Sequence, residues 1–167
     1  MRHKPVPPVP DDLETLRQVR GAMSLVPREE ESCCLWLMDR ANVPSEDEAR
    51  TWLTFLTALG LVEETDRGFV RARDPADPDR EHLATAFEEG VYGVRELVEI
   101  ADETGPVNAE AAFRRFREHV PRWERHRSDR WERTWRERVG RLLEWGVLLG
   151  AFERDGPRYS TRSNAPE

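Results

Sequence analysis

The amino-acid sequence predicts a mainly α-helical fold with small β-hairpins, in which one structural unit occurs twice. In both halves of the chain, apolar residues recur every three or four positions, which is typical of amphipathic helices. In both halves a long amphipathic stretch ends near a glycine, and two short β-prone runs follow around a turn that contains glycine. The length of 167 residues suits one or two small domains.

The first helices follow a proline-rich start. Residues 1–10, MRHKPVPPVP, show no periodicity, and we expect this lead to be flexible. Asp11 or Asp12 can cap a helix that runs to about Ser24, and a second helix is predicted from about Arg28 to Arg40. The residues predicted to face inward on the second helix are Cys34, Leu35, Leu37 and Met38.

A third helix begins at Ser45, and Glu48 completes a capping box with it. The apolar stripe of this helix consists of Ala49, Trp52, Leu53, Leu56 and Leu59. Gly60 ends the helix. The runs LVEET and FVRAR then form two short strands on either side of the turn Asp66-Arg67-Gly68.

This order of three helices and a hairpin resembles the winged helix-turn-helix superfamily. The resemblance is carried by the segment PSEDEARTWLTFLTALGLVEETDRGFVRAR, with its capped third helix, the run Leu-Gly-Leu-Val-Glu at residues 59–63 and the turn at Gly68. It covers residues 11–73, which we interpret as a first winged helix. It implies a transcription regulator of prokaryotic, archaeal type.

Residues 74–79 form a linker rich in proline and acid, and one long helix is predicted after it, from Arg80 to Glu103. Gly90 and Gly93 inside this stretch either allow close approach of another helix or mark a kink. We expect this helix to be the dimer element of a possible homodimer. Its candidate interface residues are Leu83, Phe87, Gly90, Val91, Gly93 and Val94.

The second half repeats the same order of elements. Asn108 can cap a helix that ends near His119, and a further helix begins near Ser128, with Gly146 after it. The apolar face of this last helix consists of Trp131, Trp135, Val139, Leu142 and Leu143. The runs LLGAFER and RYSTR form a second hairpin, which aligns with the first if two residues are inserted between the glycines. We interpret residues 80–162 as a second winged helix, followed by a tail at 163–167.

The charge is unevenly distributed along the chain. Twenty-six basic and 33 acidic residues give a net charge of -7, and Lys4 is the only lysine. This composition fits either a high-salt cytoplasm or a GC-rich genome. Residues 74–107 carry a net charge of -8, whereas residues 108–167 carry +4. Either an anionic partner binds the basic block, or the block pairs with the acidic segment of the same chain.

In a winged helix that binds DNA, the third helix lies in the major groove, and arginine and lysine neutralise the phosphates. The first third helix begins with Glu46, Asp47 and Glu48, which would repel DNA. The second copy therefore supplies the predicted DNA contacts, which are Arg125, Arg127, Arg130, Arg133, Arg141, Arg158 and Arg162. The alternative is a solvated face, in which Glu124, Asp129, Glu132 and Glu137 pair with these arginines.

Other chemistry finds little support in the sequence. It contains no phosphate-binding loop, nucleophile motif or metal-ligand spacing, so we expect no enzyme activity, no cofactor and no metal. Cys33 and Cys34 are either buried packing residues or a thiol sensor. Trp123 either stacks against a partner or anchors the packing of the two copies. No apolar run approaches the roughly 18–20 residues that span a membrane, so we expect a cytoplasmic protein.

The resulting hypothesis is a regulator that contacts double-stranded DNA mainly through its second copy. The alternative function is a winged-helix module or scaffold that binds protein without direct contact to nucleic acid. In that case the partner would bind to the first copy or the long helix. The charges around residues 122–141 distinguish the two, because arginines already paired with acidic residues 74–107 would favour the protein partner.

Overall fold

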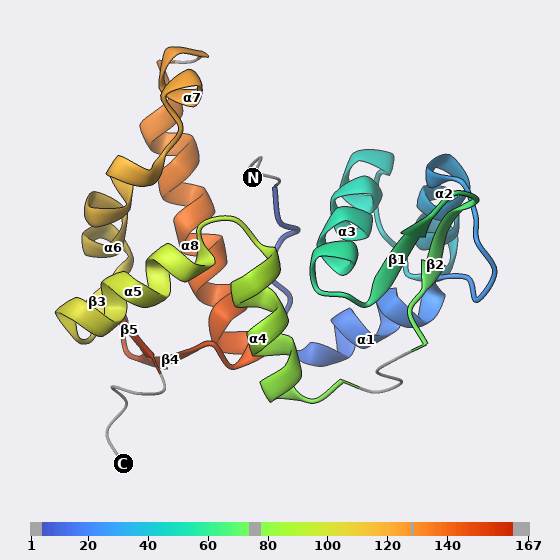
Figure 1. Cartoon of the computed structure of the whole chain (residues 1–167), viewed down its shortest axis with the longest axis horizontal. Helices are drawn as coiled ribbons and strands as arrows, with labels where there is room; N and C mark the ends of the chain where they lie inside the picture. Colours follow the sequence, from blue (N-terminus) through green and yellow to red (C-terminus); the bar gives the residue numbers. More distant parts are fainter. Residues whose placement is uncertain (1–4, 74–77, 128, 162–167) are drawn as a thin grey trace.

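The structure is a computed structural model of the chain and describes residues 5–73, 78–127 and 129–161. Helices and short hairpins form two similar units that lie side by side (Figure 1). We call residues 13–72 the first copy and residues 94–161 the second copy. One further helix, α4 (Arg80–Gly90), lies between them in sequence. The structure is therefore mainly α-helical with small antiparallel hairpins, as predicted.

The first copy has the predicted order of elements. These are α1 (Leu13–Ala22), α2 (Glu30–Arg40), α3 (Glu46–Ala58), β1 (Val62–Thr65) and β2 (Gly68–Arg71). The side chain of Asp12 caps α1 by accepting a hydrogen bond from the backbone N–H of Glu14, and Ser45 caps α3 by accepting one from Glu48. Before α2, Arg28 exchanges two backbone hydrogen bonds with Phe69, so the hairpin is also tied to the α1–α2 connection. Leu35 differs from its prediction, because it is exposed on α2.

The second copy follows the same order with three additions. Its elements are α5 (Val94–Thr104), β3 (Val107–Asn108), α6 (Ala109–Phe116), a 3-10 turn (Arg117–His119), α7 (Arg122–Arg127), α8 (Trp131–Leu149), β4 (Phe152–Asp155) and β5 (Arg158–Thr161). β3 pairs with β5, which gives the sheet order β3-β5-β4. Asn108 caps α6, as predicted. The sequence pattern did not predict β3 or α7, and Ser128 lies outside the described residues.

The prediction of a single long helix from Arg80 to Glu103 is wrong. The chain forms α4 and α5 with a break between them, where Val91 is extended and Gly93 has a φ of 93°. The sequence left two roles open for Gly90 and Gly93, close approach of another helix or a kink, and each glycine has one of them. A Cβ at Gly90 would lie 2.1 Å from the carbonyl oxygen of Ala58, so Gly90 permits the close approach of α3. Gly93 permits the bend.

The break places the predicted dimer residues inside the molecule. Leu83, Phe87, Val91 and Val94 are buried in one core shared by both copies. Gly90 faces the backbone of α3, and a Cβ at Gly93 would lie 3.0 Å from the ring of Phe116. These six residues therefore pack the chain against itself, which corrects their assignment as candidate dimer-interface residues.

The second hairpin aligns with the first without an insertion. Gly146 lies inside α8, where a Cβ would lie 2.1 Å from the ring of Phe152, and the helix ends at Gly150 with a φ of 89°. Gly150 therefore corresponds to Gly60, which has a φ of 74°. Both strands of the second hairpin then match those of the first. The expected two-residue insertion came from aligning the wrong glycine.

Aromatic side chains join the two copies at the centre of the molecule. Phe55 of α3 lies 4.6 Å from Trp145 of α8 and 6.3 Å from Phe87 of α4, measured between ring centroids. Trp52 of α3 also contacts Trp145, edge to face. The third helices of the two copies therefore face each other across a common core.

The described part of the lead, residues 5–10, lies against α8 (Figure 1). Val6 is buried, Arg141 donates a hydrogen bond to its carbonyl oxygen at 3.2 Å, and Trp145 Nε1 donates one to the carbonyl oxygen of Pro7 at 2.8 Å. The sequence of the lead has no periodicity and predicts a flexible segment. These contacts join it to the core instead.

Candidate functional site

The N-terminal end of α8 and the short helix α7 form one end of the second copy (Figure 1). We call the exposed residues there the arginine tip. They are Arg122, Trp123, His126, Arg127, Asp129, Arg130 and Arg133. Four of these seven side chains are arginines and one is acidic, so the tip carries a net positive charge.

Two arginines near this end contact tryptophan rings, Arg125 across α7 and α8 and Arg138 within α8. Arg125 donates a hydrogen bond to the carbonyl oxygen of Arg117, and its guanidinium lies 5.0 Å from the ring of Trp131. Arg138 stacks on Trp135 at 5.0 Å. Burial lowers the pKa of Arg138, and Glu124 opposes that shift. Since Arg125 and Arg138 are occupied in this way, they support the tip more than they extend it.

Acidic neighbours account for part of the basic block. Arg117 pairs with Glu132 at 2.6 Å, and Arg136 pairs with Glu110 of α6 at 2.8 Å. At the tip itself, Arg133 lies 3.8 Å from Glu137, but its side chain is 79% exposed, and such surface pairs contribute little. The acidic partners of Arg133 and Arg136 are Glu137 and Glu110, and neither belongs to the acidic segment 74–107.

The structure separates the seven predicted DNA-contact residues. Arg127, Arg130 and Arg133 come together at the arginine tip. Arg125 and Arg141 bind backbone carbonyls of Arg117 and Val6. Arg158 begins β5 at the other end of α8, away from the tip (Figure 1), and Arg162 lies outside the described residues.

Trp123 is a tip residue whose role the sequence left open. Its side chain is 51% exposed on α7, so it is not an anchor between the copies. An exposed tryptophan between arginines offers a flat apolar face beside positive charge. Arg122 and His126 also join the tip, and their type and clustering were visible in the sequence, but their exposure was not.

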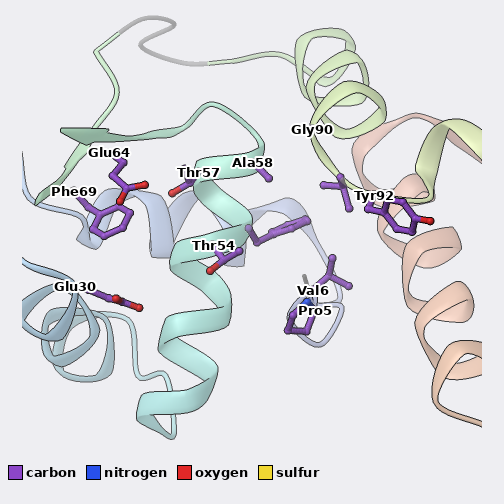
Figure 2. A pocket seen from close by; sticks show the side chains of 12 residues that line it. Pro5, Val6, Glu30, Thr54, Thr57, Ala58, Glu64, Phe69, Gly90 and Tyr92 are labelled. Carbon is purple, nitrogen blue, oxygen red and sulfur yellow. The ribbon is translucent and has the colours of Figure 1, made fainter. Parts of the chain in front are cut away.

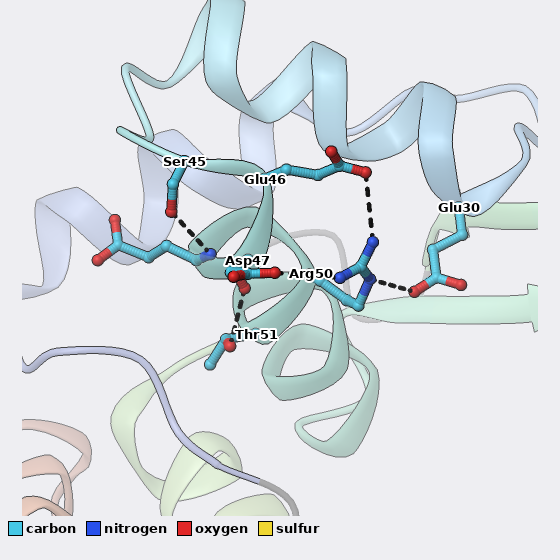
Figure 3. Close-up of polar contacts among 7 residues, drawn as sticks. Glu30, Ser45, Glu46, Asp47, Arg50 and Thr51 are labelled. Carbon is cyan, nitrogen blue, oxygen red and sulfur yellow. Dashed lines mark hydrogen bonds and ion pairs between the residues drawn. The ribbon is translucent and has the colours of Figure 1, made fainter.

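The corresponding end of the first copy is acidic. Arg50 of α3 contacts three carboxylates, those of Glu30 at 3.2 Å and of Glu46 and Asp47 at 3.3 Å each (Figure 3). Because a single positive charge contacts three negative ones, this end of α3 has a net negative charge. It therefore suits the positive end of the helix dipole and not a phosphate backbone.

The thiols of the two cysteines are buried and therefore poorly accessible to reagents. Cys33 and Cys34 are free and buried in α2. Burial raises the pKa of Cys33 to about 11, with a further contribution from Cys34, and burial also raises the pKa of Cys34. Reactive cysteines have lowered pKa values and accessible sulfur, so these thiols fit packing better than sensing.

The residues that the structure describes contain neither a candidate metal site nor a candidate membrane span. No group of three or more His, Cys, Asp or Glu side chains there could hold a metal ion. No helix in the same residues is long and apolar enough to cross a membrane.

Comparison with known proteins identifies a family for this chain. The model of a protein family described as the halobacterial double winged helix domain matches residues 1–165. No curated protein and no solved structure matches the chain.

Proposed function

Because the chain belongs to the halobacterial double winged helix family, we propose that it binds double-stranded DNA as a transcription regulator, through the arginine tip of its second copy. The observation that carries the proposal is the exposure of Arg122, Arg127, Arg130 and Arg133 around the N-terminal end of α8. Winged helices that bind DNA place this half of the third helix in the major groove. Arginine there can contact phosphates and base edges.

The shape of the molecule supports contact through the tip. α8 has 19 residues, so it is about 28 Å long at 1.5 Å per residue. Its C-terminal half packs in the shared core through Trp145, whereas its N-terminal end and α7 project from the rest of the molecule (Figure 1). A duplex can therefore approach Arg127, Arg130 and Arg133 without displacing the first copy.

The first copy offers less to DNA. The start of α3 carries Glu46 and Asp47, and Trp52 and Phe55 on the same helix pack against Trp145. A helix that is acidic at its start and covered on one face is poorly suited to enter a groove between phosphates. The proposal therefore assigns direct DNA contact to the second copy.

The high-salt interpretation of the composition agrees with the halobacterial family. At 1 M salt the Debye length is about 3 Å, so only groups in close contact with a phosphate gain much electrostatic energy. Arginine suits such conditions because its planar guanidinium forms paired hydrogen bonds with phosphate oxygens. DNA binding should accordingly be measured over a range of salt that includes molar concentrations.

A protein partner remains the second candidate, and one observation favours it for the first copy. Leu25 and Val26, between α1 and α2, and Leu35 on α2 are all more than half exposed. Large exposed apolar side chains are typical of protein contact surfaces when they lie together. These three residues belong to the first copy and the arginine tip to the second, so the two functions are compatible.

The experiment that tests the proposal compares two double variants with equal charge change. Arg127→Glu/Arg130→Glu reverses two charges at the tip, and Arg17→Glu/Arg67→Glu reverses two exposed charges on the first copy. In gel-shift titrations with random genomic duplex fragments, we expect the tip variant to bind at least tenfold more weakly than the wild type. Equal affinity of the two variants would contradict the proposal.

A further inference from the structure

A groove crosses the outer face of α3, between the first hairpin and the break that separates α4 from α5 (Figure 2). Its volume is about 370 Å³. Thr54, Thr57 and Ala58 of α3 line it together with Phe55. The remaining lining residues are Pro5, Val6, Glu30, Glu64, Phe69, Gly90, Val91 and Tyr92.

One side of the groove is apolar and firmly held. Val6, Phe55 and Val91 are buried, and the Tyr92 hydroxyl donates a hydrogen bond to the carbonyl oxygen of His119 at 2.6 Å, which fixes its ring. Figure 2 shows Pro5, Val6 and Tyr92 on the same side of α3. This wall exists only because the chain breaks at Gly93 and the lead lies against α8.

The other side of the groove carries its charge. Among the described residues, Glu30 and Glu64 are the only ones that line the groove with an Asp, Glu, Lys or Arg side chain, and Figure 2 shows both on the side of α3 where Phe69 lies. Glu30 already pairs with Arg50. Glu64 is exposed on β1 and forms no ion pair with the residues that the structure describes.

The composition of this lining differs from that of the chain. The sequence contains 25 arginines, yet none of those that the structure describes lines the groove. A cavity with apolar walls and an excess of carboxylate attracts a positive group attached to an apolar body, and repels an anion of the same shape. The volume lies within the range of about 300–1,000 Å³ that is usual for small-molecule sites.

We propose that this groove binds a small organic cation, in which an ammonium group is attached to an aromatic or aliphatic body. The ammonium group lies against the carboxylate of Glu64, and the apolar body crosses Thr54 towards Val6 and Tyr92. An alkylamine with an ordinary pKa of about 10.4 is charged at neutral pH, so it can form this contact. The site does not depend on the proposed DNA binding.

Three probes with the same phenylpropyl body test the charge requirement. Phenylpropylamine is a cation, phenylpropanol is neutral and phenylpropionate is an anion. In ligand-observed NMR titrations of the full chain, we expect the amine to bind at least fivefold more tightly than the alcohol, and the anion to bind most weakly. Equal affinities of amine and alcohol, or tightest binding of the anion, would overturn the proposal.

Two variants locate the site. Glu64→Gln should weaken binding of the amine at least threefold and leave binding of the alcohol unchanged. Glu63→Gln is the matched control, because Glu63 is the neighbour of Glu64 on β1, points to the opposite face of the hairpin and does not line the groove. Thr54→Phe should fill the groove and abolish binding of both probes. Equal effects of the two glutamate variants, or undiminished binding to a folded Thr54→Phe variant, would show that the amine binds elsewhere.

Discussion

The indole rings of Trp52 and Trp145 meet edge to face, with their centroids 5.8 Å apart. Trp52 belongs to the third helix of the first copy and Trp145 to the third helix of the second. Each third helix therefore buries part of its surface against the other copy. As a result, the two copies share one core and the cationic end of α8 is left exposed.

Removing the Trp145 ring should destabilise both copies together. Trp145→Ala removes a fully buried ring that contacts Trp52 and Phe55, and such substitutions typically cost about 3–5 kcal/mol of unfolding free energy. We expect one cooperative transition at lower denaturant concentration in circular dichroism. Trp123→Ala is the matched control, since its exposed ring should change the unfolding free energy by less than about 0.5 kcal/mol. Loss of only half of the helical signal in a first transition would contradict a shared core.

Truncating one valine of the lead should show that this segment belongs to the fold. Val6→Ala removes two buried methyl groups beside α8 and should lower the unfolding free energy by about 1–2 kcal/mol. Val26→Ala makes the same chemical change at an exposed position and should be nearly neutral. If urea titrations of the two variants gave the same midpoint, the lead would not be part of the core.

The parts of this fold that local chemistry determines could be predicted from sequence. The caps at Asp12, Ser45 and Asn108 and the two hairpins depend on residues close together in the chain, and the structure has all of them. Gly90 and Gly93 left a kink open as one interpretation, but the apolar stripe continues across the break and favoured one long helix. At the break, Gly90 leaves room for the backbone of Ala58 and Gly93 leaves room for the ring of Phe116, and both of these neighbours are distant in sequence.

The candidate site could likewise be predicted only in part from the sequence. Arginine content and its clustering before the last long helix were visible in the sequence, and they led to Arg127, Arg130 and Arg133. Which arginines stay exposed was not visible, because Arg125 and Arg141 bind backbone carbonyls of Arg117 and Val6. The bond from Arg141 to Val6 joins residues 135 positions apart, which no periodicity can reveal.

The buried groups that ionise at high pH should make the protein sensitive to alkali. Burial raises the pKa of Cys33 from 9.0 to about 11, and burial with a hydrogen bond to Glu144 raises that of Tyr159 from 10.0 to about 12. Above about pH 9 the unfolded chain loses these protons first, so the unfolded state is favoured and stability falls as the pH rises towards 11–12.

Denaturant midpoints measured from pH 7 to 11 should therefore decrease above pH 9, and Cys33→Ala should lessen the decrease. At pH 8 the native thiols should react with an aromatic disulfide reagent only after denaturant is added. Rapid reaction of the folded protein would contradict the burial of Cys33 and Cys34.

The salt dependence of DNA affinity tests the central claim most directly. The logarithm of the association constant should fall linearly with the logarithm of the salt concentration, with a slope of about -0.9 for each phosphate neutralised. If Arg127 and Arg130 each contact a phosphate, the slope for Arg127→Ala/Arg130→Ala should be less steep by about 1.8, while Arg17→Ala/Arg67→Ala should keep the wild-type slope. The same slope for all three proteins would contradict DNA contact through the arginine tip.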